Sequence, residues 1–280
     1  MRYLVCIIII LILAACRPVG IYPCLSSPIW LSNEMYKASA IDLSDFSVVT
    51  FNIKESEKID LAIEELRAVT QFNNPDIFLL QEMDEAGVET IAKSFGMNYL
   101  YFPASIQKNG EVNFGNAVLA KAKLSHVHKL ILPHKRKDNQ IRIGTSCIAE
   151  VKGKQLLLYS VHLATIMVAR NKRHEQMDAL VADILNKASS IDAVIVGGDF
   201  NTLFEKDLRA LVDKFENAGL DWQTEEVGAT GSYYLNLIKP RNDHVFTSGI
   251  DFLSSSKIED VRASDHWPVM LRMGITSYSE

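Results

Sequence analysis

The sequence has few cysteines and no long apolar run, and each absence excludes a class of protein or site. Four cysteines occur in 280 residues without a Cys-x-x-Cys spacing, so a structural zinc site is not expected. The apolar run at residues 4–13 is too short to span a bilayer, which takes about 20 residues. The sequence also lacks an internal repeat and the interleaved aromatics of single-strand nucleic-acid binders.

The overall composition is that of a globular protein with a substantial core. Hydrophobic residues make up 48% of the chain and charged residues 22%, which is ordinary for a folded domain. The formal net charge of -5 argues against a protein that coats nucleic acid electrostatically. It does not exclude a nuclease, because a metal-binding cleft needs carboxylates.

The first sixteen residues resemble a bacterial lipoprotein signal. Arg2 precedes the apolar run, which ends in Leu13-Ala14-Ala15-Cys16, a sequence similar to the lipobox. The alternatives are an ordinary signal peptide with a chance cysteine or an uncleaved anchor. We expect residues 1–15 to be a signal peptide and Cys16 to carry the lipid, which places the protein in the bacterial cell envelope, facing the periplasm or the surface.

The remainder divides into a tether and one catalytic domain. Residues 16–44 hold the lipidated cysteine and several prolines without a steady period, so we expect a tether with some local structure. Residues 45–275 contain no linker and are expected to form the domain. Cys24 and Cys147 could pair in an oxidising compartment or remain two free thiols.

Apolar periodicity predicts strands and helices in alternation. The strands are expected at 46–52, 76–82, 98–102, 115–121, 140–151, 154–162, up to 197, 243–248 and 267–273. The helices are expected at 57–72, 86–95, 169–187 and 206–217, the first of them ended by Pro75. Helix–strand alternation mixed with consecutive strands favours an α/β fold with mixed sheets.

Two polar clusters next to apolar strands carry the chemistry. One is Gly197-Gly198-Asp199-Phe200-Asn201 and the other is Ser264-Asp265-His266. Ligands in open α/β sheets bind beyond the carboxyl ends of the strands, and an imidazole titrates near neutral pH. Together the clusters indicate metal-assisted phosphoester hydrolysis. Further polar residues at strand ends, which such sheets can bring to the same rim, are Asn52, Glu82 and His162.

Six short motifs, in this order, resemble the endonuclease/exonuclease/phosphatase family. They are Phe51-Asn52, Gln81-Glu82, Gly115-Asn116-Ala117-Val118-Leu119, Val161-His162-Leu163, Gly198-Asp199-Phe200-Asn201 and Ser264-Asp265-His266. The family includes DNase I-like nucleases, abasic-site endonucleases, sphingomyelinases and inositol-phosphate phosphatases. The resemblance implies a four-layer α/β/β/α sandwich with two packed mixed β-sheets and a site at one edge.

The resemblance also implies a role for each matching residue. Glu82 would bind Mg²⁺ or Mn²⁺, assisted by Asn52 and Asp265, which fits the preference of Mg²⁺ for oxygen ligands. Asp199 would orient or deprotonate the attacking water, and Asn201 would hold a phosphate oxygen. His162 would donate to a nonbridging phosphate oxygen, and His266 would do similar work or transfer a proton.

The imidazole of His266 should need an orienting carboxylate, and two candidates exist. Asp243 is preferred because Asp243-His244-Val245-Phe246 resembles the family's form, while Asp251 is the alternative. Arg142, Arg173, Gln176 and Thr230 are expected to support the site. The basic run His134-Lys135-Arg136-Lys137 suits either a phosphate-binding loop or, more commonly, a solvated hairpin tip.

The leading hypothesis is therefore a metal-dependent phosphodiesterase or nuclease that acts outside the cytoplasm. A phospholipid, sphingomyelin or inositol-phosphate phosphoesterase is the alternative, although Ile166-Met167-Val168 is small for a lipid-binding loop. A catalytically dead binding member of the family is disfavoured because Glu82, Asp199 and His266 are all present. The expected partners are a phosphoester substrate, nucleic acid favoured, and a membrane through the lipid anchor; no protein partner is evident.

Overall fold

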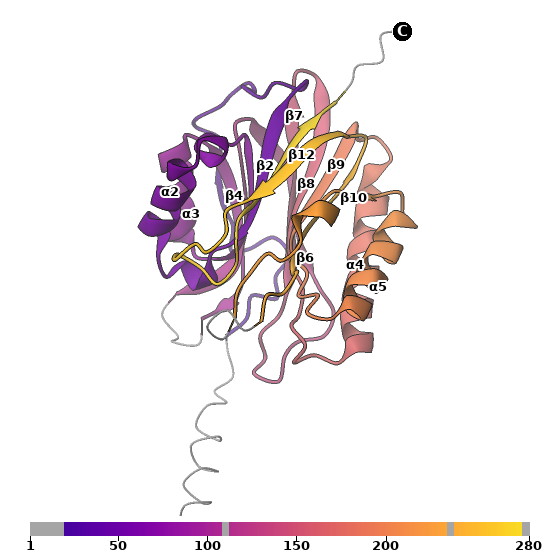
Figure 1. The fold of residues 1–280 in the computed structure, drawn as a ribbon. Helices are drawn as coiled ribbons and strands as arrows, with labels where there is room; N and C mark the ends of the chain where they lie inside the picture. The colour runs from indigo at the N-terminus through magenta and orange to yellow at the C-terminus, as the bar shows by residue number, and fades with distance from the viewer. Residues whose placement is uncertain (1–19, 108–111, 234–237, 276–280) are drawn as a thin grey trace, which may run out of the picture.

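Two mixed β-sheets pack face to face (Figure 1). The structure is a computed structural model that describes residues 20–107, 112–233 and 238–275. In spatial order, the first sheet is β1-β4-β5-β3-β2-β13-β12 and the second is β10-β11-β9-β8-β7-β6. The strands are β1 (Trp30–Ser32), β2 (Phe46–Asn52), β3 (Ile77–Met83), β4 (Asn98–Ile106), β5 (Asn113–Ala120), β6 (Lys123–Ile131), β7 (Ile143–Val151), β8 (Lys154–His162), β9 (Ala193–Asp199), β10 (Asp221–Trp222), β11 (Asp243–Ser248), β12 (Asp251–Lys257) and β13 (Val269–Gly274).

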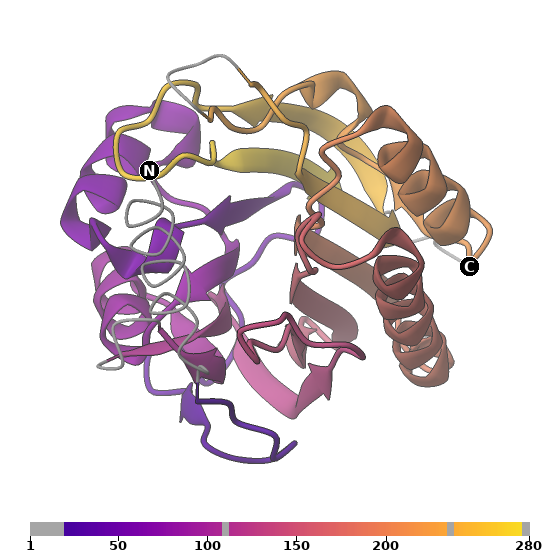
Figure 2. The ribbon, with the colours of Figure 1, turned by 90° about the horizontal axis from the view of Figure 1, so that it is seen from below.

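Helices cover the outer face of each sheet, which makes four layers (Figure 2). The first sheet is covered by α2 (Ile59–Ala68) and α3 (Glu85–Phe95), and the second by α4 (Arg170–Ala188) and α5 (Glu205–Glu216). Three short 3₁₀ helices are η1 (Lys54–Ser56), η2 (Thr70–Phe72) and η3 (Glu225–Val227). The predicted α/β/β/α sandwich is confirmed.

Three apolar layers hold the sandwich together. Leu79 and Ile195 belong to the layer between the sheets, Phe78 and Leu66 to the layer under α2 and α3, and Phe246 to the layer under α4 and α5. Full burial of such a side chain stabilises the fold by about 1.5–3 kcal/mol. Central strands are buried on both faces, which is why their sequences read as continuous apolar runs.

Two parallel strand pairs bring the polar strand ends to one edge of the sandwich. β2 runs parallel to β3, with Asn52 opposite Gln81. β8 runs parallel to β9, with His162 opposite Asp199. β11 runs antiparallel to β9 and therefore begins at the same edge, with Asp243 opposite Asp199. This edge, the lower one in Figure 1, is called the catalytic edge below.

Several elements differ from the prediction. β1, β6, β10 and β12 were not predicted, and β1 lies within the expected tether, where it pairs with β4. Helix α2 covers Ile59–Ala68 rather than the expected 57–72, and it ends there because Val69 has an extended backbone (φ -105°, ψ 115°). β7 begins at Ile143, so Arg142 precedes the strand in which it was expected.

The structure tests the possible disulfide but not the predicted lipoprotein signal. Cys24 is exposed and Cys147 is buried, and both are free thiols, so the disulfide that the sequence left open does not form. Cys16 and the signal peptide lie outside the described residues. No helix in the described part of the chain is long and apolar enough to cross a bilayer.

Gly198 should be irreplaceable where β9 meets β8. A Cβ there would approach the carbonyl oxygen of Val161 to 1.9 Å, and the backbone φ is +154°. We expect Gly198→Ala to lower the free energy of unfolding by roughly 3 kcal/mol or more in urea denaturation. The control is Gly144→Ala, whose Cβ would meet nothing closer than 3.7 Å. Equal stability of the two variants would contradict the close approach.

Candidate active site

A polar pocket of about 300 Å³ opens at the catalytic edge. Its walls come from the ends of β3, β8 and β9, from the loops that follow β2, β8 and β9, and from the segments before β11 and β13. The sequence had placed Glu82, His162, Asp199, Asn201, Asp265 and His266 in one site, and all six line this pocket. The other lining residues are Lys54, Glu55, Glu57, Thr165 and Tyr233.

Unusual backbone conformations aim two of these side chains. Glu82 has φ 59° and Asn201 has φ 53°, the left-handed region that non-glycine residues seldom adopt. At Glu82 the pairing of β3 with β5 is irregular between Leu80 and Met83, so the glutamate departs from strict strand alternation. Such strain persists where the surrounding structure enforces it, and it clusters at functional sites.

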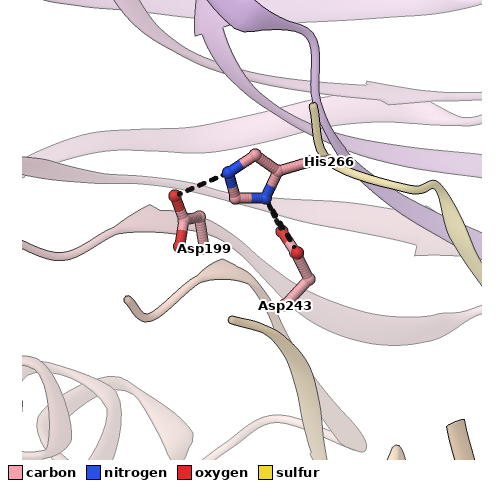
Figure 3. Close-up of side chains that lie close together, drawn as sticks. All are labelled: Asp199, Asp243 and His266. Carbon is pink, nitrogen blue, oxygen red and sulfur yellow. Dashed lines mark hydrogen bonds and ion pairs between the residues drawn. The ribbon is translucent and has the colours of Figure 1, made fainter. Parts of the chain in front are cut away.

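The imidazole of His266 lies between two carboxylates, as Figure 3 shows. Its Nδ1 is 2.9 Å from Oδ2 of Asp243, and its Nε2 is 3.7 Å from Oδ2 of Asp199. Asp243 is fixed in turn by Thr230, whose hydroxyl donates to Oδ2 at 2.7 Å. The backbone N–H of His266 donates to the Ser264 hydroxyl, and that hydroxyl donates to the Asn52 carbonyl.

These neighbours make His266 a buried cation. Burial by itself would lower its pKa, but the carboxylates of Asp243 and Asp199 outweigh burial and raise the pKa to about 10. The imidazole therefore keeps both protons at neutral pH. His162 is also buried, and burial together with the positive charges of Arg142 and His266 holds its pKa well below the ordinary value, so His162 is neutral.

Asp199 is the centre of the site. Its Oδ2 accepts from the Asn52 amide at 3.1 Å and lies 3.3 Å from Nε2 of His162, while its Oδ1 accepts from the backbone N–H of Asn201 at 2.9 Å. Burial raises the pKa of Asp199 to about 7, with further raising by Asp243 and partial opposition from His266. A carboxylate with this pKa can exchange a proton near neutral pH.

Two carboxylates in the pocket fit a hard divalent cation. No N–H or O–H of the described residues donates a hydrogen bond to the side chain of Glu82 or Asp265. The nearest basic side-chain nitrogen to Glu82 in the described part of the chain is Nε2 of His162, 3.9 Å from Oε1. Both carboxylates line the pocket, so their oxygens are available as ligands of the type that Mg²⁺ prefers. Asn52 also offers Oδ1, which accepts from the backbone N–H of Lys54 at 3.1 Å.

A second cluster of side chains has the spacing of a metal site, but its histidine is protonated. Among the described residues, the ligand atoms of Asp199, Asp243 and His266 lie within 4.8 Å of one another. A doubly protonated imidazole has no lone pair for a metal, and it already pairs with both carboxylates. This group is therefore suited to holding and moving protons, and Glu82 with Asp265 is the better cation site.

Three other residues that were expected to support the site are buried, and two of them hold loops in place. The side chain of Gln176 accepts from the N–H of Ala164 and donates to the carbonyls of Pro133 and His134, which ties two loops together. Arg173 donates to the carbonyl of Val168 and to Asp207. Arg142 lies 5.3 Å from the ring of Phe114, and its buried Nε and Nη1 have no hydrogen-bond partner among the described residues.

Some predicted candidates are separated from the pocket. Asp251 is exposed at the start of β12, whereas Asp243 contacts His266, so the choice that the sequence left open falls to Asp243. His134 pairs with Glu175 at 2.6 Å and Arg136 pairs with Asp138, with Lys135 and Lys137 exposed between β6 and β7. His244 is buried, donates or accepts at Thr202, and has a pKa lowered to about 3 by burial.

Sequence reasoning missed two residues next to His266. The Tyr233 hydroxyl lies 2.9 Å from Nε2 of His266, and the Asn242 amide donates to that hydroxyl at 2.8 Å. Burial strongly raises the pKa of Tyr233, so the phenol stays neutral. Asn242 directly precedes Asp243, but no pattern marks Tyr233, which comes from a loop far from the motifs.

The comparisons with known proteins bear on the family and on the fold. A sequence model of the Endonuclease/Exonuclease/phosphatase family matches residues 49–266. A UPF0294 protein of Vibrio vulnificus strain YJ016 is 29% identical over 119 residues, which are 42% of this chain and 39% of that protein. The match thus spans less than half of the curated relative.

Solved structures share the fold. The catalytic domain of human nocturnin with a bound sulfate anion has a TM-score of 0.66 at 20% identity, over 84% of this chain and 97% of that one. D. rerio TDP2 complexed with a single-strand DNA product has a TM-score of 0.63 at 18% identity, over 82% of this chain and 99% of that one. At these identities the likeness is one of fold.

The charge on His266 should depend on Asp243. In the metal-free protein, we expect ¹⁵N-histidine NMR to show both ring nitrogens of His266 protonated at pH 8, since its pKa is raised to about 10. Asp243→Asn removes the largest raising influence, so His266 should then become neutral well below pH 8. A wild-type His266 that titrates at its ordinary pKa would contradict the buried cation.

Proposed function

This chain belongs to the endonuclease/exonuclease/phosphatase family, and from that premise we propose that it is a divalent-metal-dependent phosphodiester hydrolase acting outside the cytoplasm. The observation that carries the proposal is the shared contact of Asp199 with Asn52, His162 and His266 at one wall of the pocket. A proton-accepting carboxylate, a neutral imidazole and a buried imidazolium meet there, beside two carboxylates that suit a cation.

Asp199 takes the role of the base. Its pKa of about 7 lets it accept a proton from a water molecule near neutral pH. The Asn52 amide and the backbone N–H of Asn201 hold its two oxygens in place. Asn201 also donates from its side chain to the Leu163 carbonyl at 3.0 Å, which fixes the loop that faces the substrate.

The two histidines stabilise the charge that develops on phosphorus oxygens. His266 is cationic because of Asp243, and a fixed positive charge in a water-poor site favours an anionic transition state. His162 is neutral and can donate one N–H to a nonbridging oxygen. A cation held by Glu82 and Asp265, with help from Asn52, would act as a Lewis acid on the phosphoryl group.

Nucleic acid is the favoured substrate, and a phospholipid, sphingomyelin or inositol-phosphate headgroup is the second candidate. One observation supports the second: Ile166 and Met167 are exposed next to Thr165, which lines the pocket. We also propose the location, a cell-envelope protein anchored through Cys16. A non-catalytic binding role is disfavoured, because a pocket without catalysis would have no need of the buried charges on Asp199 and His266.

Removing the base should slow turnover by orders of magnitude while the chain still folds. We expect Asp199→Asn to lower kcat by about 10²–10⁴-fold and to lower the melting temperature as well, because His266 loses one of its two carboxylate partners. The assay uses duplex DNA, abasic DNA, RNA, sphingomyelin, inositol phosphates and bis-p-nitrophenyl phosphate. The matched control is Asp251→Asn at an exposed position. Near-wild-type turnover by Asp199→Asn would refute the assignment.

The cation should be indispensable for turnover but not for folding. EDTA is expected to abolish hydrolysis, and Mg²⁺ or Mn²⁺ to restore it. Calorimetric titration of Mg²⁺ should show binding to the wild type and weakened binding to Glu82→Gln, because one ligand carboxylate is lost. Full hydrolysis in EDTA would count against a metal mechanism.

A further inference from the structure

We propose that the catalytic edge docks on an anionic phospholipid bilayer through Ile166, Met167 and Phe204, so that the pocket opens toward the membrane surface. These three residues are called the apolar rim. The inference builds on the proposed lipid anchor and goes beyond it, because an anchor by itself does not fix which face of the protein meets the membrane.

The apolar rim is exposed although its side chains are large and hydrophobic. Met167 is 71% exposed, Phe204 50% and Ile166 48%. Ile166 and Met167 directly follow Thr165 of the pocket wall, and Phe204 follows Asn201 by three residues. Large exposed apolar side chains that gather on a surface mark an interaction site, and here all three follow residues of the pocket wall closely in the chain.

Two loops present the rim together. The Asn201 side chain donates to the Leu163 carbonyl, and Arg170 donates to the Lys206 carbonyl at 2.9 Å and to Asp207 at 2.8 Å. Between the exposed pair and α4, Val168 is buried, and its carbonyl accepts from Arg173 at 2.9 Å. These hydrogen bonds hold the backbone of the two loops in place, so the exposed side chains of the rim project from an ordered segment.

The described chain begins at the same edge. β4 runs parallel to β3 through their common partner β5, so it ends at the catalytic edge. The Gly20 carbonyl accepts from the N–H of Ile106 at 2.8 Å, and Tyr22 donates to the Ala104 carbonyl at 3.0 Å. The next residue after β4, Gln107, donates to the carbonyl of Glu55 in the pocket wall at 2.9 Å.

Geometry then constrains how a lipid on Cys16 would hold the protein. Cys16 is four residues before Gly20, and four extended residues reach at most about 14 Å. A lipid within this reach of Gly20 would turn the catalytic edge toward the bilayer. The far edge, where β12 begins and α4 ends, would face away.

The charges around the rim suit anionic headgroups. Lys135 and Lys137 are exposed in the loop between β6 and β7, which lies at the catalytic edge, and Lys206 lies 5.9 Å from the Phe204 ring. The chain as a whole carries a net charge of -5, so contact with anionic headgroups would depend on these lysines. Basic side chains next to inserted apolar ones are the usual combination for binding at a membrane interface.

The test asks which face of the full chain touches the bilayer. Met167→Trp and Phe204→Trp report on the rim; Leu185→Trp and Leu253→Trp are matched controls at positions 51% and 52% exposed on α4 and β12. Each variant is added to phosphatidylcholine–phosphatidylglycerol vesicles with brominated acyl chains, and the emission of the wild type is subtracted. We expect a blue shift and quenching for the rim variants and neither for the controls.

Three results would overturn the proposal. They are unquenched rim tryptophans, equal quenching of rim and control positions, and rim tryptophans that respond to single-stranded DNA but not to vesicles. Hydrolysis of bis-p-nitrophenyl phosphate is measured on the same samples. A preparation that is quenched at the rim yet hydrolyses nothing would count against the proposed function and leave the docking surface standing.

Discussion

The active site depends most on a single buried cation, the imidazolium of His266, held between Asp243 and Asp199. Taking charges out of water costs several kcal/mol each, and only close, well-oriented partners offset that cost. Thr230, Asn52 and the N–H of Asn201 supply those partners for the two carboxylates. In the resulting site His266 is charged and His162 is neutral before a substrate arrives, which is the condition for electrostatic stabilisation of a phosphoryl transition state.

The strand arrangement of the two-sheet sandwich brings these charged groups together at one edge. The parallel pairs β2–β3 and β8–β9 end together, and β11 starts where β9 stops. Gly198 permits β9 to approach Val161 more closely than any side chain would allow. The left-handed backbones of Glu82 and Asn201 then turn their side chains at the edge, so local strain there is maintained by the apolar layers behind it.

The order of the short motifs was enough to predict the sandwich and to place six of the pocket residues in one site. Most of these residues lie at strand ends, and the strand order brings those ends to the same edge. The sequence did not predict the short edge strands β1 and β10, because they pair through backbone groups and have no apolar run of their own. Tyr233 escaped because loop geometry, not periodicity, brings its hydroxyl to His266. The choice between Asp243 and Asp251 needed register, since only the pairing of β11 with β9 sets Asp243 opposite Asp199.

The central claim is that Asp199, His266 and Asp243 act as one unit. A double-mutant cycle on kcat with Asp199→Asn and Asp243→Asn tests it directly, since residues that act together give non-additive losses. The account predicts that the double variant is no slower than the slower single variant. Losses that simply multiply would show that the two carboxylates act independently and would contradict the account.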